Sequence, residues 1–323
     1  MSGSSERFRK LTDDEFLDEV SQGIEELESF RLEMRSLFIK RIFIGVLIFL
    51  PCIFVAMILD GIMQAILSFE ISIFSPVTFF GVPIWVLLPM LAYKKAYKDK
   101  FLTRIATMFG DLNYCTDVNK EFEFSRNISK SQALPACSKH TEDYFYGNYK
   151  GCEIEFSELR LSVKDTSKDS AVSEVTVFSG LCYLVSLPRN FHGHTILVKN
   201  GSKLVEIFTE ARTGLEKVNL VDPEFEEFFD VYSDDQVEAR YLIDLRFIEK
   251  YKSLMQDSSG VGGVLAEYYE GKLLLLTSRE HGLFDVAKLS KEADNRESLL
   301  SLRHDLLSVF DVIDGMEIIQ SKN

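Results

Sequence analysis

Residues 42–59, IFIGVLIFLPCIFVAMIL, are an apolar run without a single charge. As a helix rising 1.5 Å per residue, the run is about 27 Å long, which is close to the hydrocarbon thickness of a bilayer. A second run at 71–93, ISIFSPVTFFGVPIWVLLPMLAY, is also long enough to span. Core helices of a soluble protein are the alternative, but helices of this length normally keep a polar face. We therefore predict transmembrane helices at 42–59 and 71–93, joined by a short extracytoplasmic loop at 60–70.

Basic residues flank the two runs on one side only. No Lys or Arg lies between Arg41 and Lys94, where Asp60 and Glu70 are the charged residues. The positive-inside rule then places both termini in the cytoplasm, with the protein in the cytoplasmic (inner) membrane. The membrane-orienting basic residues are Arg35, Lys40, Arg41, Lys94, Lys95 and Lys98.

The segment before the first run predicts an amphipathic helix at 13–41, after a disordered N-terminus at 1–12. Apolar residues recur there at spacings of three and four, and they are Phe16, Val20, Ile24, Leu27, Phe30, Met34 and Leu37. Such a stripe packs on another helix. Two partners stay open: the basic exit helix expected at 94–113, or the same stripe of a second subunit in a homo-oligomer.

Residues 114–323 predict a cytosolic α+β domain with an antiparallel sheet. Segments rich in β-branched and aromatic residues come first, and YYEGKLLLLTS indicates a hairpin through Glu270–Gly271. Helical patterns follow at 223–229, 234–255 and 293–313, the last ending at Gly315 as a C-terminal glycine would. Strands grouped mostly before helices, without βαβ alternation, are typical of the α+β class.

The charge of the soluble part limits its partners. Residues 101–323 hold 25 Lys and Arg against 37 Asp and Glu. An acidic domain of this kind repels phosphate backbones, so we expect no nucleic-acid partner. The five cysteines are scattered singly, which is typical of reduced thiols rather than of a disulfide or zinc framework.

The stretch FDVYSDDQVEARYLID, residues 229–244, has two interpretations. In the first, Ser233 and Gln236 form a capping box, with acidic residues in the first turn of a helix. In the second, the carboxylates of Asp234, Asp235 and Glu238 bind a hard cation such as Ca²⁺ or Mg²⁺. A Ca²⁺-loop register from Asp222 fails, because the turn glycine and the final glutamate are missing. We favour the helix start.

Other motifs indicate no catalytic centre. His192 and His194 lie two residues apart in NFHGHT, but no further ligand of recognisable spacing accompanies them. The loop SSGVGG lacks the Lys and Ser/Thr of a phosphate-binding loop. We predict no catalytic residue, no metal and no cofactor.

The blocks YGNYKGCEIEFSELRL, VFSGLCYLVSLPRNFHGHTILV and DPEFEEFFDVYSDDQVEARYLI, after the two apolar runs, resemble the bacterial DUF3137 family. The resemblance covers nearly the whole chain and implies a bacterial membrane protein whose biochemical activity is unknown. It also implies a LemA-like membrane protein as a partner, because genes of the two families are often neighbours. At His192 and His194 many members carry other residues, which argues against a metal role there.

We therefore expect a membrane-anchored cytosolic interaction or scaffold protein of unknown biochemical activity. Its partners would be the lipid bilayer and another membrane protein, through a surface with contributions from Leu181, Tyr183, Phe191 and the helix face around Tyr241. The alternative is a membrane-tethered enzyme or divalent-cation sensor using residues 222–238.

Overall fold

The computed structural model describes most of the chain as helices and strands. The described residues are 8–21, 24–67, 74–108, 111–115, 124–134, 137–149, 151–165, 173–187, 191–202, 214–220, 222–259, 261–280, 289–293 and 295–317. They fall into two compact units. We call one the helical unit, residues 12–102 and 286–299, and the other the sheet unit, residues 1–11, 103–285 and 300–323.

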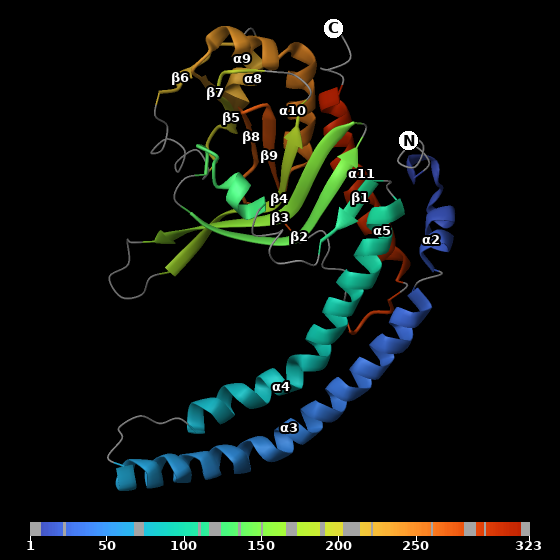
Figure 1. Ribbon diagram of the computed structural model, residues 1–323, viewed down its shortest axis with the longest axis vertical. Coiled ribbons are helices and arrows are strands. Elements are labelled where there is room, and N and C mark those ends of the chain that lie inside the picture. Colours follow the sequence, from blue (N-terminus) through green and yellow to red (C-terminus); the bar gives the residue numbers. More distant parts are fainter. Residues whose placement is uncertain are drawn as a thin grey trace. The chain divides into compact units, whose positions relative to one another are not determined.

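The helical unit contains the two apolar runs as long helices. Helix α2 spans Asp13–Ser21, α3 spans Ile24–Leu67 and α4 spans Phe74–Tyr97, continued by a π-helical turn, η1, at Lys98–Leu102. Helices α3 and α4 lie side by side over much of their length (Figure 1). By length and composition, two helices of the described chain are apolar enough to cross a membrane.

The first four residues of the amphipathic stripe are buried within this chain, and Phe30, Met34 and Leu37 are partly buried. Phe16, Val20, Ile24 and Leu27 are almost fully buried. The exit helix of the same unit contributes buried aromatic side chains, namely Tyr93, Tyr97 and Phe101. An ion pair from Lys100 Nζ to Glu26 Oε2, 3.5 Å long, links that helix to α3. These four stripe residues are thus buried within a single chain.

The sheet unit is built on one antiparallel sheet, which confirms the mixed helix-and-sheet class. Within the described residues nine strands pair in the order β1-β2-β3-β4-β9-β8-β5-β7-β6. Their bounds are β1 Asp111–Tyr114, β2 Ser138–Tyr149, β3 Cys152–Asp165, β4 Ser173–Ser186, β5 Thr195–Lys199, β6 Glu216–Lys217, β7 Phe229–Ser233, β8 Val264–Tyr269 and β9 Lys272–Ser278.

The predicted hairpin through Glu270–Gly271 is confirmed. Strand β8 ends at Tyr269, β9 begins at Lys272, and the two pair in register. Glu270 and Gly271 both have positive φ, 49° and 72°. Two left-handed residues form the turn whose twist matches that of the strands it joins.

The helices of the sheet unit differ from their predicted bounds. They are α5 Thr103–Met108, α8 Pro223–Phe228, α9 Gln236–Leu242, α10 Leu245–Asp257 and α11 Arg296–Glu317, whose first turn belongs to the helical unit. The single helix predicted at 234–255 is wrong: the chain breaks at Ile243, and Asp244 caps α10 by accepting from Phe247 N at 3.0 Å. The predicted end at Gly315 is also wrong, because α11 continues to Glu317.

Side chains on the two faces of the sheet pack against different elements. On one face, Leu184, Leu274 and Ile196 form a core with Phe124 and Leu134 of the segment 124–134, whose first five residues are helical. Rings that point to the other face pack on helices, and these ring pairs are Phe247–Tyr268, Phe229–Tyr251 and Tyr149–Phe310. Functional side chains have to be sought where polar groups interrupt these cores.

Candidate functional site

The acidic stretch after Asp222 is a series of helix caps. Asp222 caps α8 by accepting from Glu224 N and Phe225 N. Asp235 caps α9 by accepting from Val237 N at 3.0 Å and Glu238 N at 2.9 Å. Each cap satisfies backbone N–H groups that have no partner inside their own helix.

The capping box predicted from Ser233 and Gln236 is therefore wrong in its residues. Ser233 is the last residue of β7, and its Oγ accepts from Asp235 N at 3.0 Å. Gln236 donates through Nε2 to the carbonyl oxygen of Lys217. Strand β7 continues to Ser233 because it pairs with β5, so the helix begins two residues later than the box requires.

Glu238 and Asp234, two of the predicted cation ligands, form hydrogen bonds to the backbone of residues 192–194. The Glu238 carboxylate accepts from His192 N at 3.1 Å and from Gly193 N at 2.6 Å. Asp234 Oδ1 accepts from His194 N at 2.6 Å. These oxygens are occupied by backbone N–H groups of the segment that leads into β5.

The loop held by these hydrogen bonds places His194 next to a buried carboxylate. His194 Nε2 lies 2.7 Å from Glu267 Oε1, and Glu267 is fully buried in β8. The other Glu267 oxygen accepts a short hydrogen bond from Ser131 Oγ, and Gln132 N donates to Oε1 at 2.8 Å. Ser131 and His194 both face the carboxylate, so this is no nucleophile–base pair of the Ser-His kind. The arrangement satisfies a charge that burial would otherwise penalise.

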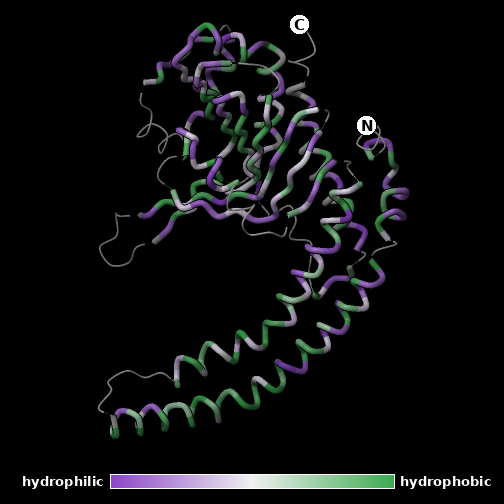
Figure 2. Tube along the Cα trace, viewed as in Figure 1, coloured by the Kyte–Doolittle hydropathy of each residue, from purple (hydrophilic) through white to green (hydrophobic). Residues whose placement is uncertain are grey.

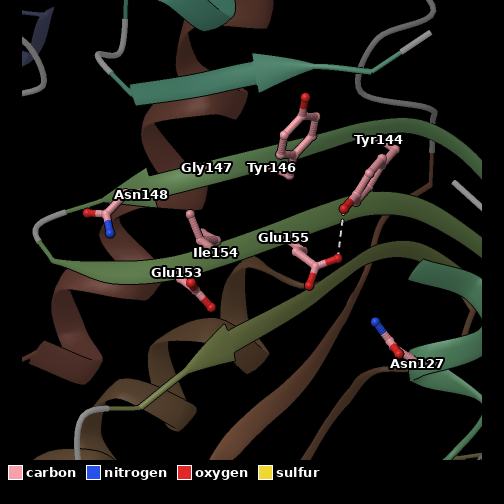
Figure 3. Close-up of a pocket in the computed structure, with 8 residues that line it drawn as sticks. All are labelled: Asn127, Tyr144, Tyr146, Gly147, Asn148, Glu153, Ile154 and Glu155. Atoms are coloured by element: carbon pink, nitrogen blue, oxygen red, sulfur yellow. Dashed lines mark hydrogen bonds between the residues drawn. The ribbon is translucent and has the colours of Figure 1, made fainter. Parts of the chain in front are cut away.

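A pocket opens on the same face of the sheet, over β2 and β3 (Figure 3). Its volume is about 550 Å³. Tyr144 and Tyr146 alternate along β2, and Glu153 and Glu155 alternate along β3, so all four project from one face. The remaining lining residues are Asn127, Gly147, Asn148 and Ile154.

A hydrogen bond fixes the inner side of this pocket. The Tyr144 hydroxyl donates to Glu155 Oε2 at 2.7 Å. Burial first, and the Glu155 carboxylate second, raise the pKa of the Tyr144 phenol, which therefore keeps its proton. The rings of Tyr144 and Tyr146 are 5.6 Å apart and nearly parallel, at 19°.

Sequence reasoning missed this pocket, although a signal was present. Tyr-x-Tyr in YFYGNY and Glu-x-Glu in CEIEF each repeat at the strand period, so each pair shares a face. Their juxtaposition depends on the pairing register, in which Tyr146 lies opposite Glu155.

A second acidic group surrounds the bulge in β2. Ligand atoms of Glu142, Asp143 and Glu158 lie within 4.8 Å of one another, the one such group among the described residues. Asp143 is buried, has φ +56°, and accepts from the Tyr114 hydroxyl at 2.8 Å. The cluster differs from the predicted candidates Asp234, Asp235 and Glu238.

The remaining predicted residues divide between surface and core. Leu181, Tyr183 and Phe191 are buried, so they belong to the core and not to a binding surface. Tyr241 is exposed. Of the histidines without a predicted role, His140 and His304 are exposed, and His281 lies outside the described residues.

The membrane-orienting basic residues lie on the helical unit. Arg35, Lys40 and Lys95 are exposed, and Lys94 and Lys98 are partly buried. Arg41 contacts α4: its Nη1 donates to the Trp85 carbonyl oxygen at 2.8 Å, and its guanidinium lies 5.0 Å from the Trp85 ring centre.

Comparisons with known proteins identify a family that matches part of the chain. Residues 176–318 match the family described as "Protein of unknown function (DUF3137)", which confirms the resemblance over that region. No curated protein sequence matches significantly. A crystal structure of the mycobacterial trehalose monomycolate transport factor A, TtfA, is similar at 12% identity and a TM-score of 0.26, over 53% of this chain and 73% of TtfA.

Proposed function

Because residues 176–318 belong to a family of unknown function, DUF3137, we propose a function from the chain's own surfaces: a membrane-anchored interaction or scaffold protein. In this proposal α3 and α4 form a hairpin in the cytoplasmic membrane of a bacterium. Both termini and the sheet unit lie in the cytoplasm, and the sheet unit binds another membrane protein.

The anchor is supported by the apolar surface of the two long helices. Many side chains along their middle are hydrophobic and exposed, and the tube of the two helices is mostly coloured hydrophobic there (Figure 2). Phe43 is 73% exposed, Leu47 76% and Leu50 72%. Soluble proteins rarely expose apolar patches of this extent to water, whereas lipid accepts them.

The lengths of the two helices support the same proposal. Asp60 accepts from Phe74 N, Ser75 N and Ser75 Oγ at 2.6–2.9 Å, and so joins α3, about two turns before its last residue Leu67, to the start of α4. From this junction, Arg41 lies about 29 Å back along α3 and Lys94 lies about 30 Å on along α4. Both basic flanks are thus about one bilayer thickness from the Asp60 junction.

The interaction role rests on one observation, an apolar row on the sheet unit. Val237 and Tyr241 lie one turn apart on α9, and Leu245 starts α10; their exposed fractions are 77%, 51% and 68%. The acidic sheet unit around them favours a partner with a basic, partly apolar cytosolic segment. A LemA-like membrane protein is the candidate that the family resemblance offers.

Topology can be tested by cysteine labelling. Ala65→Cys, at the tip of the hairpin, and Glu216→Cys, on β6, are exposed positions in a background without the native cysteines. We expect a membrane-impermeant maleimide to label position 65 in right-side-out vesicles and position 216 only in inverted ones. Labelling of both positions from the same side would contradict the proposed topology.

The interaction can be tested by co-purification with a co-expressed LemA-like protein in mild detergent. We expect the double variant Val237→Asp, Tyr241→Asp to lose the complex. Val261→Asp, at another exposed apolar residue, is the matched control and should keep it. Retention by the double variant would exclude this row as the binding surface, and self-association of the purified protein would identify a second copy as the occupant.

The cation-sensor alternative makes a different prediction. If Asp234, Asp235 and Glu238 bound a divalent cation, Ca²⁺ or Mg²⁺ would raise the melting temperature of the wild type but not that of an Asp234→Asn, Glu238→Gln variant. The interaction proposal expects no such difference.

A further inference from the structure

The pocket over β2 and β3 has the chemistry of a cation site. Its wall carries two tyrosine rings, and Tyr146 is only partly buried, so part of its ring is accessible. The face of an aromatic ring is negative and attracts cations, and the attraction grows where water is excluded.

The pocket carries two carboxylates, and no basic side chain among its described lining residues balances their charge. The described residues that line it include Glu153 and Glu155 and no Lys, Arg or His. Among the contacts of the described residues, one oxygen of Glu155 accepts from Tyr144, and nothing donates to its other oxygen or to Glu153. Within the described part of the chain, these oxygens are therefore available as acceptors for a ligand.

The size and spacing of the pocket fit an organic cation better than a metal ion. Two carboxylates two residues apart on a strand are separated by about 7 Å at their Cα atoms. No metal-ligand group of the described residues includes either of them. The volume of about 550 Å³ lies within the usual range for small-molecule pockets.

We propose that this pocket binds an organic ammonium group, with Glu155 as the counter-charge and Tyr146 as the aromatic wall. The hydrogen bond from Tyr144 holds Glu155 in place. The proposal is independent of the membrane anchor and of the row around Tyr241. The ammonium group could belong to a free amine or to a lipid headgroup, since both present the same chemistry.

The test is a titration of the full-length protein with choline, in nanodiscs of phosphatidylglycerol, which has no amine headgroup. We expect saturable binding that Glu155→Gln weakens at least about tenfold, because the charge is lost and the volume kept. Glu216→Gln, the same change on the distant edge strand β6, is the matched control and should bind like the wild type.

The aromatic wall is tested separately. Tyr146→Leu should weaken choline binding by about 2- to 30-fold, the range expected for losing one cation–π contact. Tyr146→Phe keeps the ring face and should retain binding. Circular dichroism and the melting temperature of each variant show that it remains folded.

The result has clear alternatives. Unsaturable choline binding, or equal binding by wild type and Glu155→Gln, would overturn the proposal. Binding of Mg²⁺ that depends on Glu155, without choline binding, would also overturn it and indicate a metal site. If choline binds, a lower apparent affinity in nanodiscs with phosphatidylethanolamine identifies the lipid headgroup as the competing source, and an unchanged affinity identifies a free amine.

Discussion

Gly193 lies where the acidic helix start meets the loop before β5. A Cβ atom at this position would come within 2.7 Å of Glu238 Oε2 and 3.0 Å of Asp234 Oδ1. These oxygens cannot withdraw freely, because they accept backbone hydrogen bonds from residues 192–194. Because Gly193 has no side chain, residues 192–194 can form these hydrogen bonds to Asp234 and Glu238. The same hydrogen bonds place His194 next to Glu267.

Gly193→Ala should lower the free energy of unfolding by about 1–3 kcal/mol, since one or more charge-assisted hydrogen bonds must break or lengthen. Chemical denaturation of the detergent-solubilised protein measures the change. His192→Ala is the control: its backbone N–H remains and its side chain is exposed, so stability should stay within about 0.5 kcal/mol of wild type. Similar losses for both variants would mean that the imidazole, and not the backbone, holds the loop.

Helices α3 and α4 are joined by specific polar contacts at two places. One is the junction at Asp60, a buried acid that caps the start of α4. The other is at Trp85, whose carbonyl would normally accept from the residue four positions later. That residue is Pro89, which has no N–H, and Arg41 donates to the carbonyl instead.

Asp60→Ala should destabilise the helical unit by about 2 kcal/mol or more, because two backbone N–H groups and one hydroxyl lose a charged acceptor. Thermal unfolding in detergent, followed by circular dichroism, measures it. Asp60→Asn keeps one carbonyl oxygen and should lose less. An unchanged melting temperature for Asp60→Ala would show that water or lipid headgroups replace the carboxylate at no cost.

Across the whole sheet unit, buried tyrosines link stability to alkaline pH. Burial raises the pKa of Tyr144, Tyr251, Tyr268 and Tyr269 above the ordinary value of 10.0. In the unfolded chain these phenols ionise near pH 10, whereas in the folded chain they stay neutral.

The contribution of these tyrosines to stability should therefore be constant below pH 10 and should fall as the pH rises above it, because the unfolded state then releases protons that the folded state keeps. Each tyrosine contributes at most about 1.4 kcal/mol per pH unit. Urea midpoints between pH 8 and pH 11 test this, and Tyr251→Phe should give a shallower decline. A midpoint that is constant up to pH 11 would contradict the proposed burial of these phenols.

The sequence by itself determined the features that depend on periodicity and composition. Two apolar helices, an acidic α+β unit, the antiparallel sheet and the turn at Glu270–Gly271 all follow from local patterns, which are properties of neighbouring residues. Local patterns also located the acidic caps to within a few residues. They misplaced the cap of α9 because strand pairing with β5 extends β7 to Ser233, and pairing is not a local property.

Only the tertiary structure decided what the single polar residues in apolar segments do. Glu267 in VLAEYY and Asp60 directly after the first apolar run are conspicuous in the sequence, but their partners, Ser131, His194 and Ser75, come from other segments. The pocket likewise depends on the register that sets Tyr146 opposite Glu155. A buried charge must find hydrogen-bond partners, yet which ones it finds is fixed by contacts between distant segments, and these arise only when the sheet and its covering elements assemble.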